Sequence, residues 1–192
     1  MSAIALFPLN TVLFPGGLLP LRIFEPRYVD MVGRCMRAGE AFGVVLMLGG
    51  SDTDREVDTA PIGTSARIVD FQTLEDGLLG LLCRGERRFR IVGHSRQEDG
   101  LNRAEVEWLT EAARLPVADE FAPLLPVLRG ALAQLKSVGH LIEPDYEDAG
   151  WVSYRVAELL PLDQQQQQVL LELDDPAERL GRVAPLFDLP QS

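Results

Sequence analysis

Residues 6–28 read LFPLNTVLFPGGLLPLRIFEPRY, and this stretch decides the fold of the first half of the chain. Two short apolar runs, residues 4–9 and 18–24, flank a connection that contains proline and paired glycines. This pattern is typical of two strands joined by an irregular loop. The second run stops at Glu25, and Pro26 suits the first turn of a helix. The stretch therefore predicts a strand, a loop, a second strand and an immediate helix.

Prolines limit where the two predicted strands can pair. Pro8 and Pro20 lack a backbone N–H, so each must lie at a strand end, on a sheet edge or at a bulge. In the second run Leu19, Leu21 and Ile23 share one face, because side chains alternate along a strand. That face is expected to point to the core.

The residues that follow predict one helix and several more strands. Apolar residues recur at helical spacing over residues 26–38, and residues 41–48 form a short apolar run typical of a buried strand. With the opening pair, about six short strands and one helix are expected, which favours a small β-barrel. The further strands are predicted at residues 63–73, 78–84, 88–91 and 103–108.

Beyond residue 115 the apolar period changes from 2 to 3.6, which indicates a second, helical part. Four amphipathic helices are predicted there, and two have clear start signals: Asp163 precedes five glutamines, and Asp175 precedes a proline and a glutamate. We therefore predict an α+β fold, with a β-barrel at residues 1–114 and a helical bundle subdomain at residues 115–192.

The opening stretch resembles the N-terminal signature of the Lon-protease substrate-binding domain family. Three later segments, residues 60–70, 76–92 and 156–180, resemble further blocks of that family in the same order. The resemblance implies a PUA-like barrel followed by helices. It also implies a non-enzymatic module that binds unfolded or partner polypeptides. In full-length members an ATPase and a Ser-Lys protease follow this domain, and the chain ends where they would begin, so an isolated domain is expected.

Composition and length agree with a globular protein. The chain has 192 residues, of which 46% are apolar and 24% charged, enough for one sizeable core or one core plus a helical annex. No apolar run approaches the roughly 18 to 20 residues that span a bilayer, and no basic segment precedes the first apolar one, so we expect a cytoplasmic protein without a membrane partner. Without an export signal, Cys35 and Cys83 are expected to be buried free thiols.

Motifs for catalysis or cofactor binding are not found in the sequence. The chain's one lysine, Lys136, stands in Leu135-Lys136-Ser137, so no P-loop is present. The histidines and cysteines show none of the short spacings by which a helix or knuckle presents metal ligands, and no nucleophile elbow occurs. We therefore expect no enzyme activity, no metal and no cofactor.

Charge argues against nucleic acid as a partner. The formal net charge is −11. Residues 1–114 carry 13 arginines against 16 acidic side chains, and residues 115–192 carry 5 basic against 13 acidic ones. A phosphate backbone needs a basic footprint, which this chain lacks.

Two short segments are candidates for a polypeptide-binding surface. One is the loop tip at Leu13, Phe14 and Pro15, which carries apolar groups, and the other is the helix entrance at Glu25, Arg27 and Tyr28, which offers a charged and aromatic rim. A structural alternative stands beside each candidate. Leu13 and Phe14 can pack as a plug on the end of the barrel, and Glu25 with Arg27 can simply cap the helix.

The sequence is also compatible with two other functions. One is a small-ligand-binding protein or enzyme that uses a pocket between barrel and helices. The other is a regulatory adaptor that docks through the acidic helical half, because net charge can steer association. No particular oligomeric state is predicted.

Overall fold

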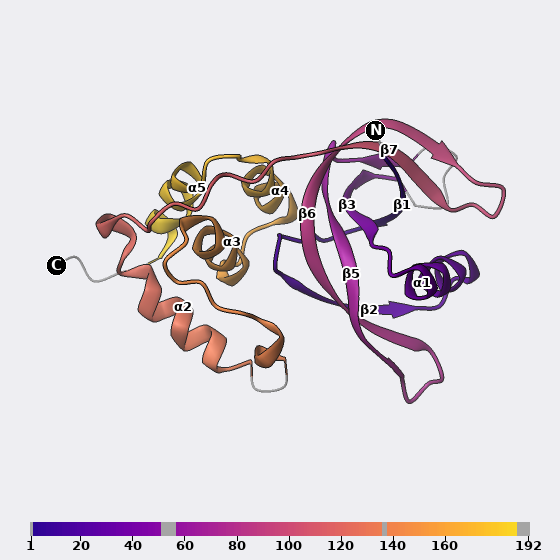
Figure 1. The fold of residues 1–192 in the computed structure, drawn as a ribbon, viewed down its shortest axis with the longest axis horizontal. Coiled ribbons are helices and arrows are strands. Elements are labelled where there is room, and N and C mark those ends of the chain that lie inside the picture. Colours follow the sequence, from indigo (N-terminus) through magenta and orange to yellow (C-terminus); the bar gives the residue numbers. More distant parts are fainter. Residues whose placement is uncertain (1, 51–56, 136–137, 188–192) are drawn as a thin grey trace. The chain divides into compact units, whose positions relative to one another are not determined.

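The computed structural model describes residues 2–50, 57–135 and 138–187, and the chain divides into two compact units, residues 1–110 and 111–192. Figure 1 shows the strands and helix α1 of the first unit and helices α2 to α5 of the second. The predicted α+β class is confirmed. Lys136 lies outside the described residues. No helix in the described part of the chain has the length and apolar content needed to cross a membrane.

The first unit holds one seven-stranded sheet and helix α1. The strand order is β1-β7-β6-β5-β3-β4; β1 also pairs in parallel with β3, and β2 pairs with β6 outside this path. The elements are β1 (Ser2–Leu9), β2 (Leu18–Ile23), α1 (Pro26–Ala38), β3 (Phe42–Gly49), β4 (Asp58–Thr59), β5 (Ile62–Thr73), β6 (Leu79–Arg96) and β7 (Asn102–Trp108).

Strand β6 is the centre of this sheet. Its first residues, Leu79–Arg84, pair with β2 on one side and with β5 on the other, and its last residues pair with β7. Figure 1 shows β5 and β6 as two long ribbons side by side. The prediction of two separate strands at residues 78–84 and 88–91 was wrong, because Gly85 and Glu86 continue the extended chain instead of turning.

Helix α1 covers the larger apolar cluster of the first unit. It spans Pro26–Ala38 as predicted and ends at Gly39, whose positive φ of 65° suits glycine. Its buried face packs against residues of β1, β3, β5 and β6. The cluster contains Phe7, Leu13, Ile23, Tyr28, Met31, Val32, Cys35, Phe42, Val44, Ala66, Leu81, Cys83 and Leu101.

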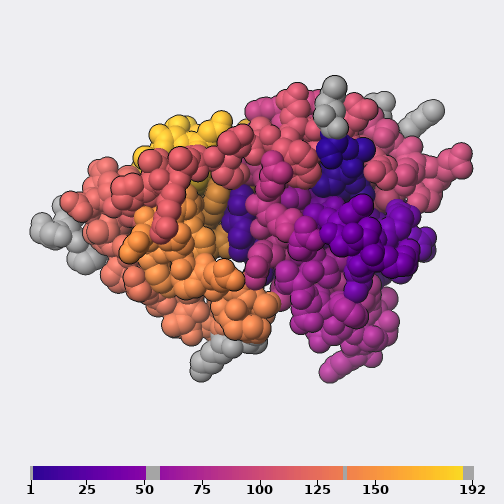
Figure 2. All heavy atoms as spheres, in the orientation of Figure 1, coloured from indigo at the N-terminus to yellow at the C-terminus, as the bar shows by residue number. Residues whose placement is uncertain are grey.

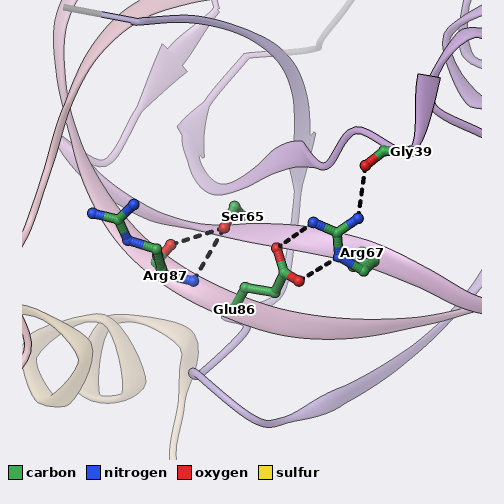
Figure 3. Close-up of polar contacts among 5 residues, drawn as sticks. All are labelled: Gly39, Ser65, Arg67, Glu86 and Arg87. Atoms are coloured by element: carbon green, nitrogen blue, oxygen red, sulfur yellow. Dashed lines mark hydrogen bonds and ion pairs between the residues drawn. The ribbon is translucent and has the colours of Figure 1, made fainter.

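A polar contact ties the end of α1 to the sheet. Arg67 of β5 donates through Nη1 to the carbonyl oxygen of Gly39 at 2.7 Å, and its guanidinium forms a two-pronged ion pair with Glu86 of β6. Figure 3 shows Arg67 reaching both groups, and beside them the hydroxyl of Ser65 bonded to the backbone of Arg87. The Arg67 side chain therefore links the β5–β6 pair to the helix end. The backbone ladder and the ion pair with Glu86 join the two strands to each other.

The second unit is helical, and aspartates begin three of its helices. The helices are α2 (Leu124–Ala133), α3 (Ala149–Leu159), α4 (Gln164–Glu172) and α5 (Pro176–Val183), with 3-10 turns at Asp119–Phe121, Gly139–Leu141 and Ala184–Leu186. The predicted caps at Asp163 and Asp175 are confirmed: Asp163 forms a capping box with Gln166, and Asp175 accepts from the Ala177 N–H at 2.9 Å. Asp148 caps α3 in the same way.

One buried arginine links α3, α4 and α5. Arg179 of α5, 1% exposed, donates to the carbonyl oxygens of Leu170, at 2.9 Å, and Leu173 at the end of α4. It also donates to the hydroxyls of Ser153, at 2.7 Å, and Tyr154, at 3.2 Å, and lies 3.9 Å from the centre of the Tyr154 ring. Arg179 thus supplies donors to two carbonyl oxygens near the end of α4.

Replacing this arginine is expected to destabilise the second unit. Arg179→Met keeps much of the side-chain volume but removes every donor, so we expect the free energy of unfolding to fall by about 3 kcal/mol. Arg182→Met on the same helix is the matched control: Arg182 is about half exposed in an i,i+4 pair with Glu178, and its loss should cost about 0.5 kcal/mol or less. Urea denaturation followed by circular dichroism measures both, and equal losses would contradict the assigned role.

The two thiols should be inert in the folded protein. Both are free and buried, as predicted. Burial raises the pKa of Cys35, and the nearby Glu40 carboxylate raises it further. Burial also raises the pKa of Cys83, with a smaller contribution from Cys35, to about 12. Since the thiolate is the reactive form, at pH 8 neither should react with a disulfide reagent until denaturant is added. Ser95→Cys, at an exposed position, should react without denaturant, and equally fast labelling of the native thiols would refute the prediction.

Candidate functional site

The predicted loop tip is packed against strand β6. Leu13 and Phe14 are 4% and 1% exposed, and Pro15 is half-buried. The Gly16 N–H donates to the Gly85 carbonyl oxygen at 2.8 Å, and the Gly85 N–H donates to the Gly17 carbonyl oxygen at 2.9 Å. The plug interpretation of Leu13 and Phe14 therefore describes their packing, and these two side chains have little surface to offer a partner.

The glycine at position 85 makes this packing possible. A Cβ placed there would lie 2.3 Å from the carbonyl oxygen of Phe14 and 3.1 Å from a side-chain carbon of Leu13. Real Cβ atoms do not approach a backbone oxygen so closely, so the loop can lie on β6 only where the side chain is absent.

Side-chain contacts fix the helix entrance to its surroundings. Arg27, 7% exposed, donates through Nη2 to Glu25 at 2.7 Å and through Nη1 to the carbonyl oxygen of Gly100 at 3.0 Å. Tyr28, 2% exposed, stacks with Phe7 at 4.0 Å between ring centroids. Arg27 and Tyr28 thus join the helix start to the β6–β7 turn and to the core, while Glu25 stays half-buried at the surface.

A groove brings part of the helix entrance together with two strands. It has a volume of about 370 Å³ and we call it the β2 groove. Glu25 and Tyr28 line it, whereas Leu13, Phe14, Pro15 and Arg27 are not among its lining residues. Its lining consists of Phe7, Pro8, Leu9, Asn10, Pro20, Leu21, Arg22, Ile23, Phe24, Glu25, Tyr28 and Met47.

Phe24 is the most exposed large apolar residue among the groove residues that the sequence interpretation did not name as candidates. It is 67% exposed, more than any other large apolar residue described, and stands directly after β2. A signal was available, because strand alternation puts Phe24 on the face opposite Ile23, the core-facing residue before it. Exposed apolar residues mark interaction surfaces when they lie together, and Phe24 lines the groove with other apolar residues.

The charges on the rim of the β2 groove are paired. Arg22 forms an ion pair with Asp76 in the β5–β6 turn, and Glu25 pairs with Arg27. Figure 2 shows the tip of the β5–β6 hairpin, coloured magenta, protruding at the bottom of the first unit. With its two lining charges compensated, the groove presents a largely apolar, electrically neutral surface.

Two other hollows share no lining residues with the β2 groove. One of about 240 Å³ lies between the end of α1 and residues 67–71 of β5, and one of about 490 Å³ in the second unit is lined by Arg114, Leu125, Tyr146 and their neighbours. Within the described residues, no three or more His, Cys, Asp or Glu side chains are grouped so that they could hold a metal ion.

The model of the ATP-dependent protease La (LON) substrate-binding domain family matches residues 3–188. The chain belongs to this family. The family resemblance drawn from the opening stretch and the three later segments is thereby confirmed.

Individual relatives agree with this assignment. The chain is 32% identical over 181 residues to the Lon protease of Paraburkholderia phytofirmans, covering 91% of this chain and 22% of that protein. It is 24% identical over 196 residues to the Lon protease of Cytophaga hutchinsonii, covering 97% of this chain and 24% of the relative. The chain therefore spans about a quarter or less of the length of these relatives.

Solved structures share the fold. A Lon N-terminal domain protein from Xanthomonas campestris matches with a TM-score of 0.77 and 37% identity, over 96% of this chain and 98% of that one. The N-terminal domain of the Mycobacterium avium complex Lon protease matches with a TM-score of 0.63 and 19% identity, over 96% and 97% of the two chains, and shows likeness of fold alone.

A substitution that adds one methyl group at Gly85 tests the close approach of the loop to β6. Gly85→Ala should lower the free energy of unfolding by about 2 kcal/mol, because the added Cβ must displace the backbone at Phe14. Gly49→Ala, also in a strand of the first unit, is the control, since nothing lies within 4 Å of a Cβ there. Thermal and urea denaturation measure both variants. A Gly85→Ala protein as stable as the Gly49→Ala protein would refute the constraint.

Proposed function

We propose that this protein is a non-enzymatic polypeptide-recognition module that binds unfolded or partner chains. The observation that carries the proposal is the match of residues 3–188 to the substrate-binding domain family of an ATP-dependent protease. A domain of that kind selects polypeptides for another module and needs no catalytic groups of its own.

The β2 groove is the surface that we assign to this recognition. Unfolded chains differ from folded ones in exposing apolar side chains, and an apolar groove with an exposed aromatic residue can bury such groups from water. Phe24 is exposed by 67% and supplies the contact. Glu25 and Tyr28 border the groove and Arg27 holds Glu25 in place.

The loop tip contributes indirectly in this proposal. Leu13 and Phe14 are buried, and Pro15 leads into the glycines bonded to β6. These three residues hold the start of β2 against its neighbour. Substitutions at Leu13 or Phe14 therefore affect binding through the fold of the groove.

Binding to an unfolded protein tests the proposal. The probe is a fluorescently labelled protein whose disulfides have been reduced and whose thiols have been alkylated with iodoacetamide. The disulfides cannot re-form, so the probe stays unfolded. The native form of the same protein is the comparison. We expect saturable binding of the unfolded probe only, measured by fluorescence anisotropy. Binding of neither form by the folded protein would overturn the proposal.

A matched pair of variants tests the site. Phe24→Ser should weaken binding about tenfold, because burial of a phenylalanine side chain contributes to affinity. Phe71→Ser is the control: Phe71 is 57% exposed on β5 and does not line the β2 groove. Both variants should stay folded, since both rings are mainly exposed. Equal losses, or no loss in either, would remove the groove from the proposal.

A further inference from the structure

We propose that the β2 groove binds its polypeptide as an added strand along the outer edge of β2, with an uncharged, apolar centre and basic flanks. This inference rests on the proposed function and names the binding mode and the class of segment. Main-chain hydrogen bonds would supply affinity without regard to sequence, and side-chain contacts would supply selection.

One edge of β2 is available for such pairing. Among the described strands β2 pairs only with β6, in one continuous antiparallel register from Leu18 with Arg84 to Ile23 with Leu79. The hydrogen bond from Gly85 N–H to the Gly17 carbonyl oxygen extends this ladder. Because hydrogen-bonded pairs alternate in an antiparallel ladder, the backbone groups of Leu18, Pro20 and Arg22 point away from β6.

The lining of the groove places this edge beside it. A strand that presents one face contributes alternate residues, but Pro20 to Glu25 all line the β2 groove. Residues 7–10, at the end of β1, also line it consecutively. There β1 pairs with β3 on one side, whereas its pairing with β7 covers Ser2–Ala5. The groove therefore follows the backbone of β2, and the end of β1 contributes to its lining.

Pro20 limits the backbone hydrogen bonds that an added strand can form with the edge of β2. It lies on the outward set and has no N–H, so the edge offers donors at Leu18 and Arg22 only, with carbonyl oxygens at all three positions. A proline on an exposed edge interrupts the regular pairing of two identical folded edges. A flexible segment can bridge the missing donor locally, so an unfolded chain suits this edge better than a second copy of the protein does.

Charge defines the chemistry of the segment. Arg22 and Glu25 are already paired with Asp76 and Arg27, so a charged side chain placed in the groove would lose water without gaining a counter-charge. The centre of the bound segment is therefore uncharged. Residues 1–114, which contain the groove, carry 16 acidic side chains against 13 arginines, and this acidic excess repels acidic flanks and attracts basic ones.

A series of synthetic peptides tests the chemistry. Each has the same central segment of about six apolar residues, to match the six residues of β2, and flanks of lysine, serine or glutamate. At low salt we expect the lysine-flanked peptide to bind about tenfold more tightly than the glutamate-flanked one, with the serine-flanked peptide between them. The difference should shrink as salt is added. Equal affinities would overturn the charge assignment.

Backbone methylation tests the strand addition. Two versions of the lysine-flanked peptide carry N-methyl groups on alternate central residues, one on the odd and one on the even set. An added strand donates with one set only, so one version should lose about tenfold in affinity and the other should change by less than about twofold. Equal effects of the two versions would overturn strand addition. Phe24→Ser should weaken the unmethylated peptide, and Phe71→Ser should not.

The unfolded-protein probe distinguishes failure of the proposed function from failure of the added strand on β2. If neither the probe nor any peptide binds, the proposed function fails. If the probe binds while no peptide does, or while the two methylated versions behave alike, polypeptide recognition stands and the added strand on β2 is refuted.

Discussion

The contact between the carbonyl oxygen of Phe14 and the bare Cα of Gly85 is the constraint on which the first unit depends. It lets the loop of residues 10–17 lie on β6, so that Leu13 joins the apolar cluster under α1 and β2 enters its ladder in register. Leu79–Arg84 of β6 can then pair with β2 and β5 together. Two segments far apart in the sequence, the opening stretch and the centre of β6, thus form one packing unit.

Much of the fold could be predicted because its signals are local. Helix α1 has both a proline at its start and a glycine at its end, and the caps at Asp163 and Asp175 satisfy N–H groups within a few residues. The continuous course of β6 could not be predicted, because Gly85-Glu86 has the composition of a turn. Its extended form depends on a loop about 70 residues earlier, and tertiary contacts override local preference there.

The candidate site shows where sequence reasoning reaches its limit. Apolar periodicity predicts which side chains are buried, and the helix entrance is a candidate because it carries charged and aromatic residues at a strand-to-helix junction. Whether an apolar residue is left exposed depends on which element covers it; Phe24 is 67% exposed, and among the described strands β2, which it follows, pairs only with β6. The same dependence explains why the sequence left two alternatives for Leu13 and Phe14, an exposed tip or a packed plug, of which the structure shows the buried one.

The pairing of β1 with β7 has a consequence for the synthesis of the protein. Ser2–Ala5 finds its partners at residues 103–106, so roughly 100 residues must leave the ribosome before this ladder can form. At ordinary elongation rates that delay is roughly 5 to 20 s, far longer than helix or hairpin formation requires. During this time β1 is a nascent apolar segment without its antiparallel partner, which is the condition in which chaperones bind emerging chains. The domain therefore spends the first seconds of its existence as the kind of chain that we propose it later recognises.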